Sequence, residues 1–244
     1  MNEITYPIRI NRYLYLKGIC SRRKADSLIA EGKVYINDHK AKLGSKVNAG
    51  DIVDVDADVA KLPATYRYFL YNKPRGIVSH NPNPGEESVE QASRLGVGIF
   101  PVGRLDKDSK GLMLLSDDGR IVNALLHPDF AHEREYEVSV DKYIKEQDLK
   151  RLARGVDIEG YSTLPAHTER IGEKSFSIIL TEGKKHQIRR MCAALGYQVT
   201  SLKRTRIMHL SIKGLKENQT RALTEKEKKE LLDMLFIGDV GRKK

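Results

Sequence analysis

The sequence predicts an α+β protein made of a small N-terminal module and a larger domain. Three observations lead to this prediction. Residues 1–60 combine short amphipathic helical stretches with brief strand-like pieces. From Tyr66 onward, longer strand candidates are joined by hairpins or helices without a regular strand–helix alternation. The chain has 244 residues, of which 40% are apolar, and this is enough to bury a core in a soluble globular protein.

The N-terminal module is predicted to hold two helices followed by a small hairpin. Ile10 and Leu14 share one face of the first helical stretch, and Ser21 is a favourable N-cap for a second helix that Gly32 ends. Turn residues at 37–38, 44 and 48–50 interrupt the strand-like segment that follows. We expect this module to span residues 1–60 and a linker at 61–65 to follow it.

The larger domain is predicted to span residues 66–240, with a basic tail at 241–244. Aromatic and aliphatic runs predict strands at 66–72, 111–116, 136–141 and 176–181. Helical periodicity predicts helices at 118–127, 145–155 and 186–195, and Gly196 ends the last of them.

The composition favours a polyanionic partner and excludes several other classes. Lys and Arg number 43 against 33 Asp and Glu, for a net charge of +10, so nucleic acid is the leading partner class and a membrane surface the second. Cys20 and Cys192 are too few and too far apart for a disulfide framework or a metal site. No apolar run approaches the roughly 18 residues of a membrane-spanning helix. We expect a cytoplasmic monomer without a metal or a cofactor.

Two clusters hold most of the positive charge. Residues 9–46 carry ten basic and three acidic side chains, and three of the basic ones occupy the first turn of the predicted second helix, where the helix dipole disfavours cations. Residues 181–206 carry seven basic side chains and one acid. A solvated basic face is the alternative, but the placement favours contacts with RNA phosphates. The candidate RNA-binding residues are Arg9, Arg12, Arg22, Arg23, Lys24, Lys33, Lys184, Lys185, Arg190, Lys203, Arg204 and Arg206.

An acidic stretch, GRLDKDSKGLMLLSDDG at 103–119, stands out in this basic chain. Asp117 and Asp118 precede Gly119 and suit a turn that caps a helix, and Asp108 suits a polar loop. Asp106 lies in a loop that enters an apolar strand, a common place for a catalytic group. From spacing alone, a structural pair of Arg104 with Asp106 is the stronger interpretation.

Four motifs that occur in order along the chain favour the catalytic interpretation of Asp106. YFLYNKPRGIVS, GRLDKDSKGLMLLSDDG, HEREYEVSVD and EGKKHQIRRM follow the N-terminal segment RINRYLYLKGICSRRKADSLI. The whole chain thereby resembles the RsuA-type ribosomal RNA pseudouridine synthases, and it is most similar to their large-subunit RluF branch. The resemblance implies an S4-like RNA-binding module and a catalytic domain with a mixed, largely antiparallel sheet. It also implies cofactor-free isomerisation of uridine to pseudouridine in RNA, with 23S ribosomal RNA as the expected substrate and a transfer RNA as a further one.

The resemblance also assigns the candidate site residues. Asp106 matches the catalytic aspartate, Tyr136 matches the aromatic residue of the next motif, and Arg189 matches the basic partner of the aspartate. Four further positions are expected to form the substrate-binding part of the site. Arg104 belongs to the motif of the aspartate, Lys73 is expected mainly to support the site, and Ile207 and Leu210 are expected to line or back the uracil pocket.

The chemistry suits these residue types. Asp106 can add to the base, add to the sugar carbon, or help form a glycal, and the sequence leaves these routes open. Arg189 would keep the carboxylate ionised and directed, while Tyr136 would stack on a uracil flipped from its helix. A non-catalytic RNA-binding or ribosome-assembly factor is the alternative function. The presence of Asp106 with Tyr136 and Arg189 argues against it, because phosphate binding alone needs no acid.

Overall fold

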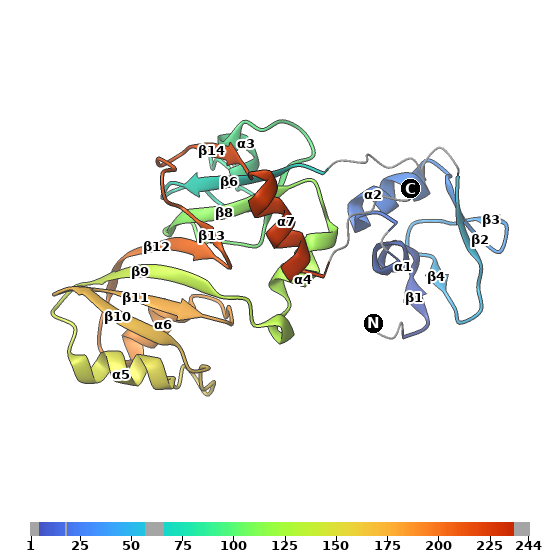
Figure 1. The fold of residues 1–244 in the computed structure, drawn as a ribbon. Helices are drawn as coiled ribbons and strands as arrows, with labels where there is room; N and C mark the ends of the chain where they lie inside the picture. The colour runs from blue at the N-terminus through green and yellow to red at the C-terminus, as the bar shows by residue number, and fades with distance from the viewer. Residues whose placement is uncertain (1–4, 18, 57–65, 237–244) are drawn as a thin grey trace. The chain divides into compact units, whose positions relative to one another are not determined.

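The computed structural model describes residues 5–17, 19–56 and 66–236 (Figure 1). The chain divides into two compact units, of which the larger one comprises Arg67–Asp117 and Asn123–Phe236. The N-terminal unit contains the described residues 5–56, and residues 118–122 group with it. The expected linker at 61–65 and the expected basic tail at 241–244 lie outside the described residues.

The N-terminal unit contains the two predicted helices, α1 (Ile10–Leu16) and α2 (Arg22–Ala30). Ser21 caps α2 as expected, since its Oγ accepts a hydrogen bond from the backbone N–H of Lys24. The helices bury one small core, in which Leu14 and Ala25 have no exposed surface.

This unit contains more strands than the expected hairpin. β2 (Val34–Ile36) pairs with β3 (His39–Lys40) as that hairpin and also pairs with β5 (Val53–Val55). β1 (Ile8–Arg9) and β4 (Lys46–Val47) form a separate antiparallel pair. Two-residue strands are too short to show a periodic pattern in the sequence.

The larger unit contains a nine-stranded sheet. Seven strands follow the order β10-β11-β9-β12-β8-β6-β14, and the other two lie off this path, β13 paired with β12 and β7 with β8. Its strands are β6 (Tyr68–Lys73), β7 (Phe100–Val102), β8 (Lys110–Ser116), β9 (Arg134–Val140), β10 (His167–Gly172), β11 (Ser175–Leu180), β12 (Val199–Ile207), β13 (Leu210–Ser211) and β14 (Thr220–Ala222). The four predicted strands correspond to β6, β8, β9 and β11, and the expected α+β class with a mixed, largely antiparallel sheet is confirmed.

One parallel contact joins the two halves of this sheet. β8 and β12 pair in parallel through Lys110 with Lys203 and Gly111 with Arg204. Gly111 has φ +111°, and a Cβ at this position would lie 2.2 Å from the carbonyl oxygen of Arg204. Only glycine therefore allows the two backbones to approach this closely.

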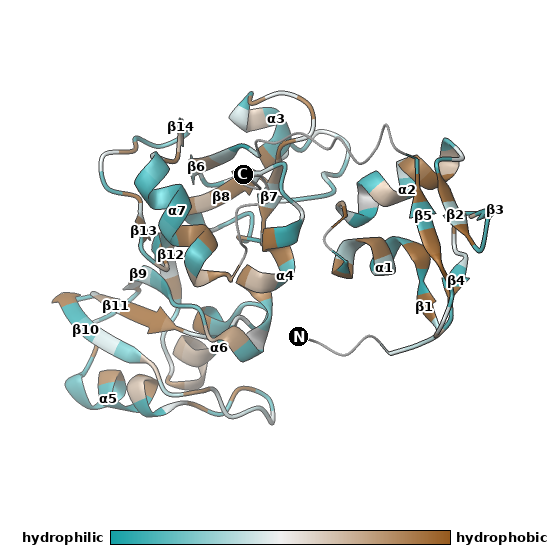
Figure 2. Cartoon of the chain, turned by 45° about the vertical axis from the view of Figure 1, so that its right-hand side comes forward, coloured by the Kyte–Doolittle hydropathy of each residue, from teal (hydrophilic) through white to brown (hydrophobic). Residues whose placement is uncertain are grey.

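The larger unit contains the helices α3 (Val89–Ser93), α5 (Glu146–Arg154), α6 (Gln187–Ala194) and α7 (Glu225–Met234), and a short 3₁₀ turn at Pro128–Phe130. Of α4 (Arg120–Leu126), residues 123–126 belong to this unit and the start groups with the N-terminal unit. One core contains residues of β9, β11, α5 and α6, and a second contains residues of β6, β8 and α3. Figure 2 shows the hydrophobic residues along β8 and β11 that contribute to these cores. Among the described residues, no helix is long and apolar enough to cross a membrane.

Candidate active site

The loop between β7 and β8 presents Asp106 from a firmly held backbone. The N–H of Ser109 donates to the carbonyl of Asp106 at 3.0 Å. The N–H of Leu105 donates to Ser79 Oγ at 2.9 Å, and that hydroxyl in turn donates to the Leu105 carbonyl at 2.6 Å. These bonds hold the main chain on both sides of Asp106, whose side chain is 41% exposed. The carboxylate is therefore accessible to a ligand while its backbone is fixed.

Lys73, at the end of β6, supports the same loop from inside. Its ammonium donates to the carbonyls of Ser109 at 2.8 Å, Pro74 at 2.9 Å and Lys107 at 3.4 Å. Burial lowers the pKa of Lys73 to about 8, although the nearby Asp106 carboxylate opposes the shift. Because Lys73 has no exposed surface, its position favours the expected role in supporting the site over direct contact with substrate. Its contacts assign it to loop support.

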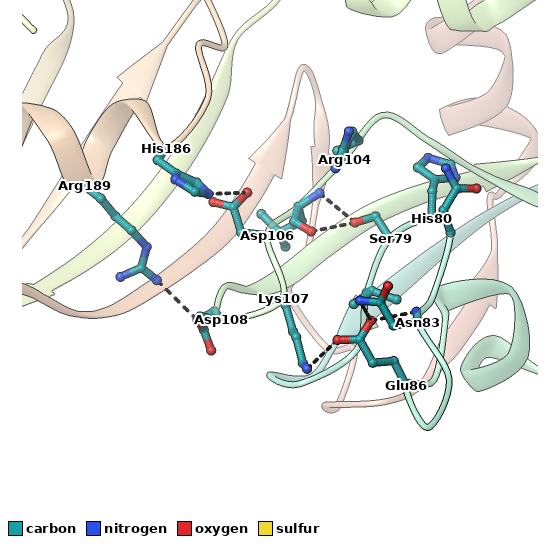
Figure 3. Close-up of a pocket in the computed structure, with 13 residues that line it drawn as sticks. Ser79, His80, Asn83, Glu86, Arg104, Asp106, Lys107, Asp108, His186 and Arg189 are labelled. Atoms are coloured by element: carbon teal, nitrogen blue, oxygen red, sulfur yellow. Dashed lines mark hydrogen bonds and ion pairs between the residues drawn. The ribbon is translucent and has the colours of Figure 1, made fainter. Parts of the chain in front are cut away.

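A pocket of about 460 Å³ opens over Asp106 (Figure 3). One wall comes from the segment that follows β6, and the opposite wall comes from the start of α6. The lining residues are Val78, Ser79, His80, Asn81, Asn83, Glu86, Arg104, Leu105, Asp106, Lys107, Asp108, His186 and Arg189. The pocket thus brings Arg189 of α6 next to Arg104 and Asp106, which lie together in the loop between β7 and β8.

His186 is the direct partner of the central carboxylate. Its Nε2 lies 3.6 Å from Asp106 Oδ1, and Figure 3 shows the two side chains pointing toward one another. Arg189 instead donates to the carbonyls of Asp108 at 3.3 Å and Val199 at 3.2 Å. Arg189 thus lines the same pocket as Asp106, but its hydrogen bonds go to these two carbonyls and not to the Asp106 carboxylate. Sequence reasoning missed His186, although it lies in the motif HQIRRM, three residues before Arg189.

Three other candidates do not line this pocket. Tyr136 is half-buried on β9 and packs against both cores of the larger unit. Ile207 and Leu210 are 2% and 0% exposed, where β12 pairs with β13. Their burial does not fit the expectation that they line the pocket, and it leaves these two aliphatic side chains a packing or backing role.

The second basic cluster is more internally paired than expected. Arg204 is 4% exposed, and its guanidinium donates to the carbonyls of Leu112 at 2.7 Å and Arg104 at 3.3 Å. Burial excludes Arg204 from the expected phosphate contacts, and its bonds instead join β12 to the Asp106 loop and to β8. Three other members of the cluster form ion pairs: Lys203 with Glu137, Arg190 with Glu159, and Arg206 with Glu133 and Glu135.

The remaining basic candidates lie mostly at the surface. Lys184 and Lys185 are exposed in the segment before α6. In the N-terminal unit Lys33 is partly buried and pairs with Glu31 at 2.8 Å. The side chain of Arg23 lies outside the description, and the exposed members of this unit are Arg9, Arg12, Arg22 and Lys24.

The pocket combines a carboxylate with an imidazole and two guanidinium groups. An ionised carboxylate in such surroundings can act as a nucleophile or as a base, and the cations can hold an anionic or electron-rich ligand beside it. Within the described part of the chain, no group of three or more His, Cys, Asp and Glu side chains could hold a metal ion.

Comparison with known proteins gives consistent matches along the chain. Residues 67–194 match the family model described as RNA pseudouridylate synthase, and residues 8–53 match the S4 domain. The chain is 39% identical to the "Dual-specificity RNA pseudouridine synthase RluF" of Salmonella typhi, over 93% of this chain and 79% of that protein. It is 35% identical to "Ribosomal large subunit pseudouridine synthase B" of Bacillus subtilis (strain 168), over 91% of this chain and 95% of that protein. A crystal structure of a pseudouridylate synthase superposes with a TM-score of 0.69 at 27% identity, covering 92% of this chain and 99% of that one.

Proposed function

The chain belongs to the RNA pseudouridine synthase family and carries an S4 domain, and on this premise we propose that Asp106 is its catalytic residue and ribosomal RNA its substrate. The observation that supports this most strongly is the carboxylate of Asp106, half-exposed in a pocket on a loop whose main chain is hydrogen-bonded on both sides. A firmly held loop keeps a reacting group within the narrow geometry that an enzyme needs.

The reaction breaks the C–N glycosidic bond of uridine, turns the uracil and rejoins it to the sugar through carbon. In the proposed mechanism Asp106 acts on a uridine flipped out of its RNA helix, at a cost of roughly a few kcal/mol for unstacking. His186 lies beside the carboxylate at 3.6 Å, and Arg104 and Arg189 bring positive charge to the same pocket. Attack on the base, attack on the sugar carbon and formation of a glycal all start from this arrangement.

We propose 23S ribosomal RNA as the substrate and a transfer RNA as a second one. The names of two relatives support this, since one is a ribosomal large subunit synthase and the other a dual-specificity synthase. The N-terminal module supplies exposed basic residues at the start of α2, where cations and the helix N-terminus can converge on a phosphate.

The substrate assignment is tested by mapping pseudouridine in total RNA from cells with and without the gene. We expect one or a few sites in 23S ribosomal RNA, and a transfer RNA site, to lose the modification and to regain it with the wild-type gene. Loss confined to transfer RNA, or no loss in either RNA, would remove 23S ribosomal RNA as the substrate.

A further inference from the structure

Glu182 lies between β11 and α6, and its buried carboxylate is surrounded by three hydrogen-bond donors. The residue is 7% exposed. The N–H of Leu164 donates to Oε1 at 2.9 Å and the Gln187 side chain donates to the same oxygen at 2.7 Å. The Tyr161 hydroxyl donates to Oε2 at 2.5 Å. Leaving a buried polar group unpaired costs about 1–3 kcal/mol, so this carboxylate fixes the segments that supply its donors.

Gln187 carries this constraint toward the pocket. Its side chain is held at both ends, because Nε2 donates to Glu182 and Oε1 accepts from the backbone N–H of Lys184 at 2.9 Å. The N–H of Gln187 also donates to the Lys184 carbonyl at 3.1 Å. These bonds close a tight turn over residues 184–187, and His186 lies within it.

The backbone of His186 needs such support. It has φ +53°, a left-handed conformation that costs a non-glycine residue roughly 1–3 kcal/mol and persists only where the surroundings impose it. The same backbone conformation directs the imidazole to within 3.6 Å of the Asp106 carboxylate. The turn that Gln187 closes therefore sets the position of the His186 imidazole beside Asp106.

We propose that Glu182 is a positioning residue of the active site. It acts through Gln187 on the turn at 184–187, and through that turn on His186 and Asp106. This inference rests on the proposed catalytic role of Asp106. The hydrogen bonds from Tyr161 and Leu164 also fasten Glu182 to the segment before β10. Arg190 on α6 binds the same segment, because its guanidinium donates to the carbonyl of Ile158 at 3.0 Å.

Two substitutions of Glu182 separate its hydrogen bonds from its charge. In Glu182→Gln the amide oxygen can still accept from Leu164 and Gln187, and the Tyr161 hydroxyl can turn to accept from the amide nitrogen, since a hydroxyl both donates and accepts. In Glu182→Ala all three bonds are lost. With a transcribed RNA that the wild-type enzyme modifies, we expect Glu182→Ala to lower kcat at least tenfold with KM changed less than threefold. Glu182→Gln should stay within threefold of wild type in both.

Asp148 provides the matched control. It is a buried carboxylate of the same core region, 6% exposed, and accepts a hydrogen bond from the Tyr197 hydroxyl at 2.8 Å, but it does not line the pocket. Asp148→Ala should lower the thermal midpoint as Glu182→Ala does and leave kcat within threefold of wild type. Tyr161→Phe removes one donor to Glu182 and serves if Glu182→Ala does not fold; its kcat should fall at least threefold.

Each contrary result overturns the inference. A folded Glu182→Ala or Tyr161→Phe enzyme with the wild-type kcat would show that the network does not position the site. A Glu182→Gln enzyme as slow as Glu182→Ala would assign the effect to charge, and an equal loss in Asp148→Ala would assign it to stability. Failure of the catalytic proposal is seen separately, because Asp106→Asn would then remain active.

Discussion

His186 Nε2 lies 3.6 Å from the Asp106 carboxylate, and both residues line one pocket. The aspartate follows β7, whereas the histidine follows β11 and is the N-cap residue of α6. Their approach depends on the sheet between them, in particular on the parallel pairing of β8 with β12. The first prediction concerns this pair.

Replacing His186 by Ala should lower kcat by roughly 10-fold to 100-fold, because the carboxylate loses the group that directs it and small misplacements are costly in catalysis. Single-turnover pseudouridine formation measures the effect. His167→Ala, an exposed histidine on β10, is the control and should keep the wild-type rate. Equal rates for His186→Ala and wild type would remove His186 from the mechanism.

Replacing Gly111 by Ala should destabilise the larger unit by about 3 kcal/mol or more, since the new Cβ meets backbone that cannot move aside. Chemical denaturation measures the change in the free energy of unfolding. Gly183→Ala is the matched control, because Gly183 has no atom within 4 Å of the new Cβ. A Gly111→Ala protein as stable as the control would contradict the close pairing of β8 with β12.

The buried Lys73 predicts a distinct pH dependence of stability. Its pKa is lowered by burial from the ordinary value of 10.5 to about 8. Between these pH values the unfolded chain holds a proton that the folded chain has released, so stability rises with pH. The free energy of unfolding of wild type relative to Lys73→Met should therefore increase from pH 7.5 to pH 10, by up to roughly 3 kcal/mol. A constant difference across this range would contradict the burial of a charged Lys73.

The first turn of α2 should contribute to the salt dependence of RNA binding. Each phosphate contact contributes about one unit to the slope of log K against log salt. Replacing Arg22 and Lys24 by Ala should therefore reduce that slope by up to about 2, as measured by filter binding at several salt concentrations. Lys226→Ala with Lys229→Ala on α7 removes the same charge and should change the slope less. Equal slopes for the two variants would place the start of α2 outside the RNA interface.

In the larger domain the sequence predicts four strands and three helices with local patterns, but it does not predict α3, α7, β7, β10, β12, β13 or β14. Strand β12 shows the reason. The segment VTSLKRTRI carries its three basic residues, Lys203, Arg204 and Arg206, close together, and this charge predicts an RNA-binding surface. In the fold, Glu137 on the neighbouring strand β9 pairs with Lys203, and Glu133 just before β9 pairs with Arg206. The side chain of Arg204 is buried. These partners are distant in sequence, so no local pattern could identify them.

The candidate site was predicted in part for a similar reason. Motif resemblance identified Asp106, Arg104 and Arg189, which the fold brings to one pocket. The role of His186 depends on a left-handed backbone angle, and the role of Glu182 depends on donors from another segment. Neither property is visible in residue types or spacing, because both arise from tertiary contacts.

The most direct test of the catalytic proposal is pseudouridine formation by Asp106→Asn on a transcribed 23S ribosomal RNA that the wild-type enzyme modifies. Asn preserves the size of the side chain and cannot act as a carboxylate, so RNA affinity should remain within about threefold of wild type while no pseudouridine forms above background. Pseudouridine formation by Asp106→Asn at a rate near that of the wild-type enzyme would contradict the assignment of Asp106 as the catalytic residue.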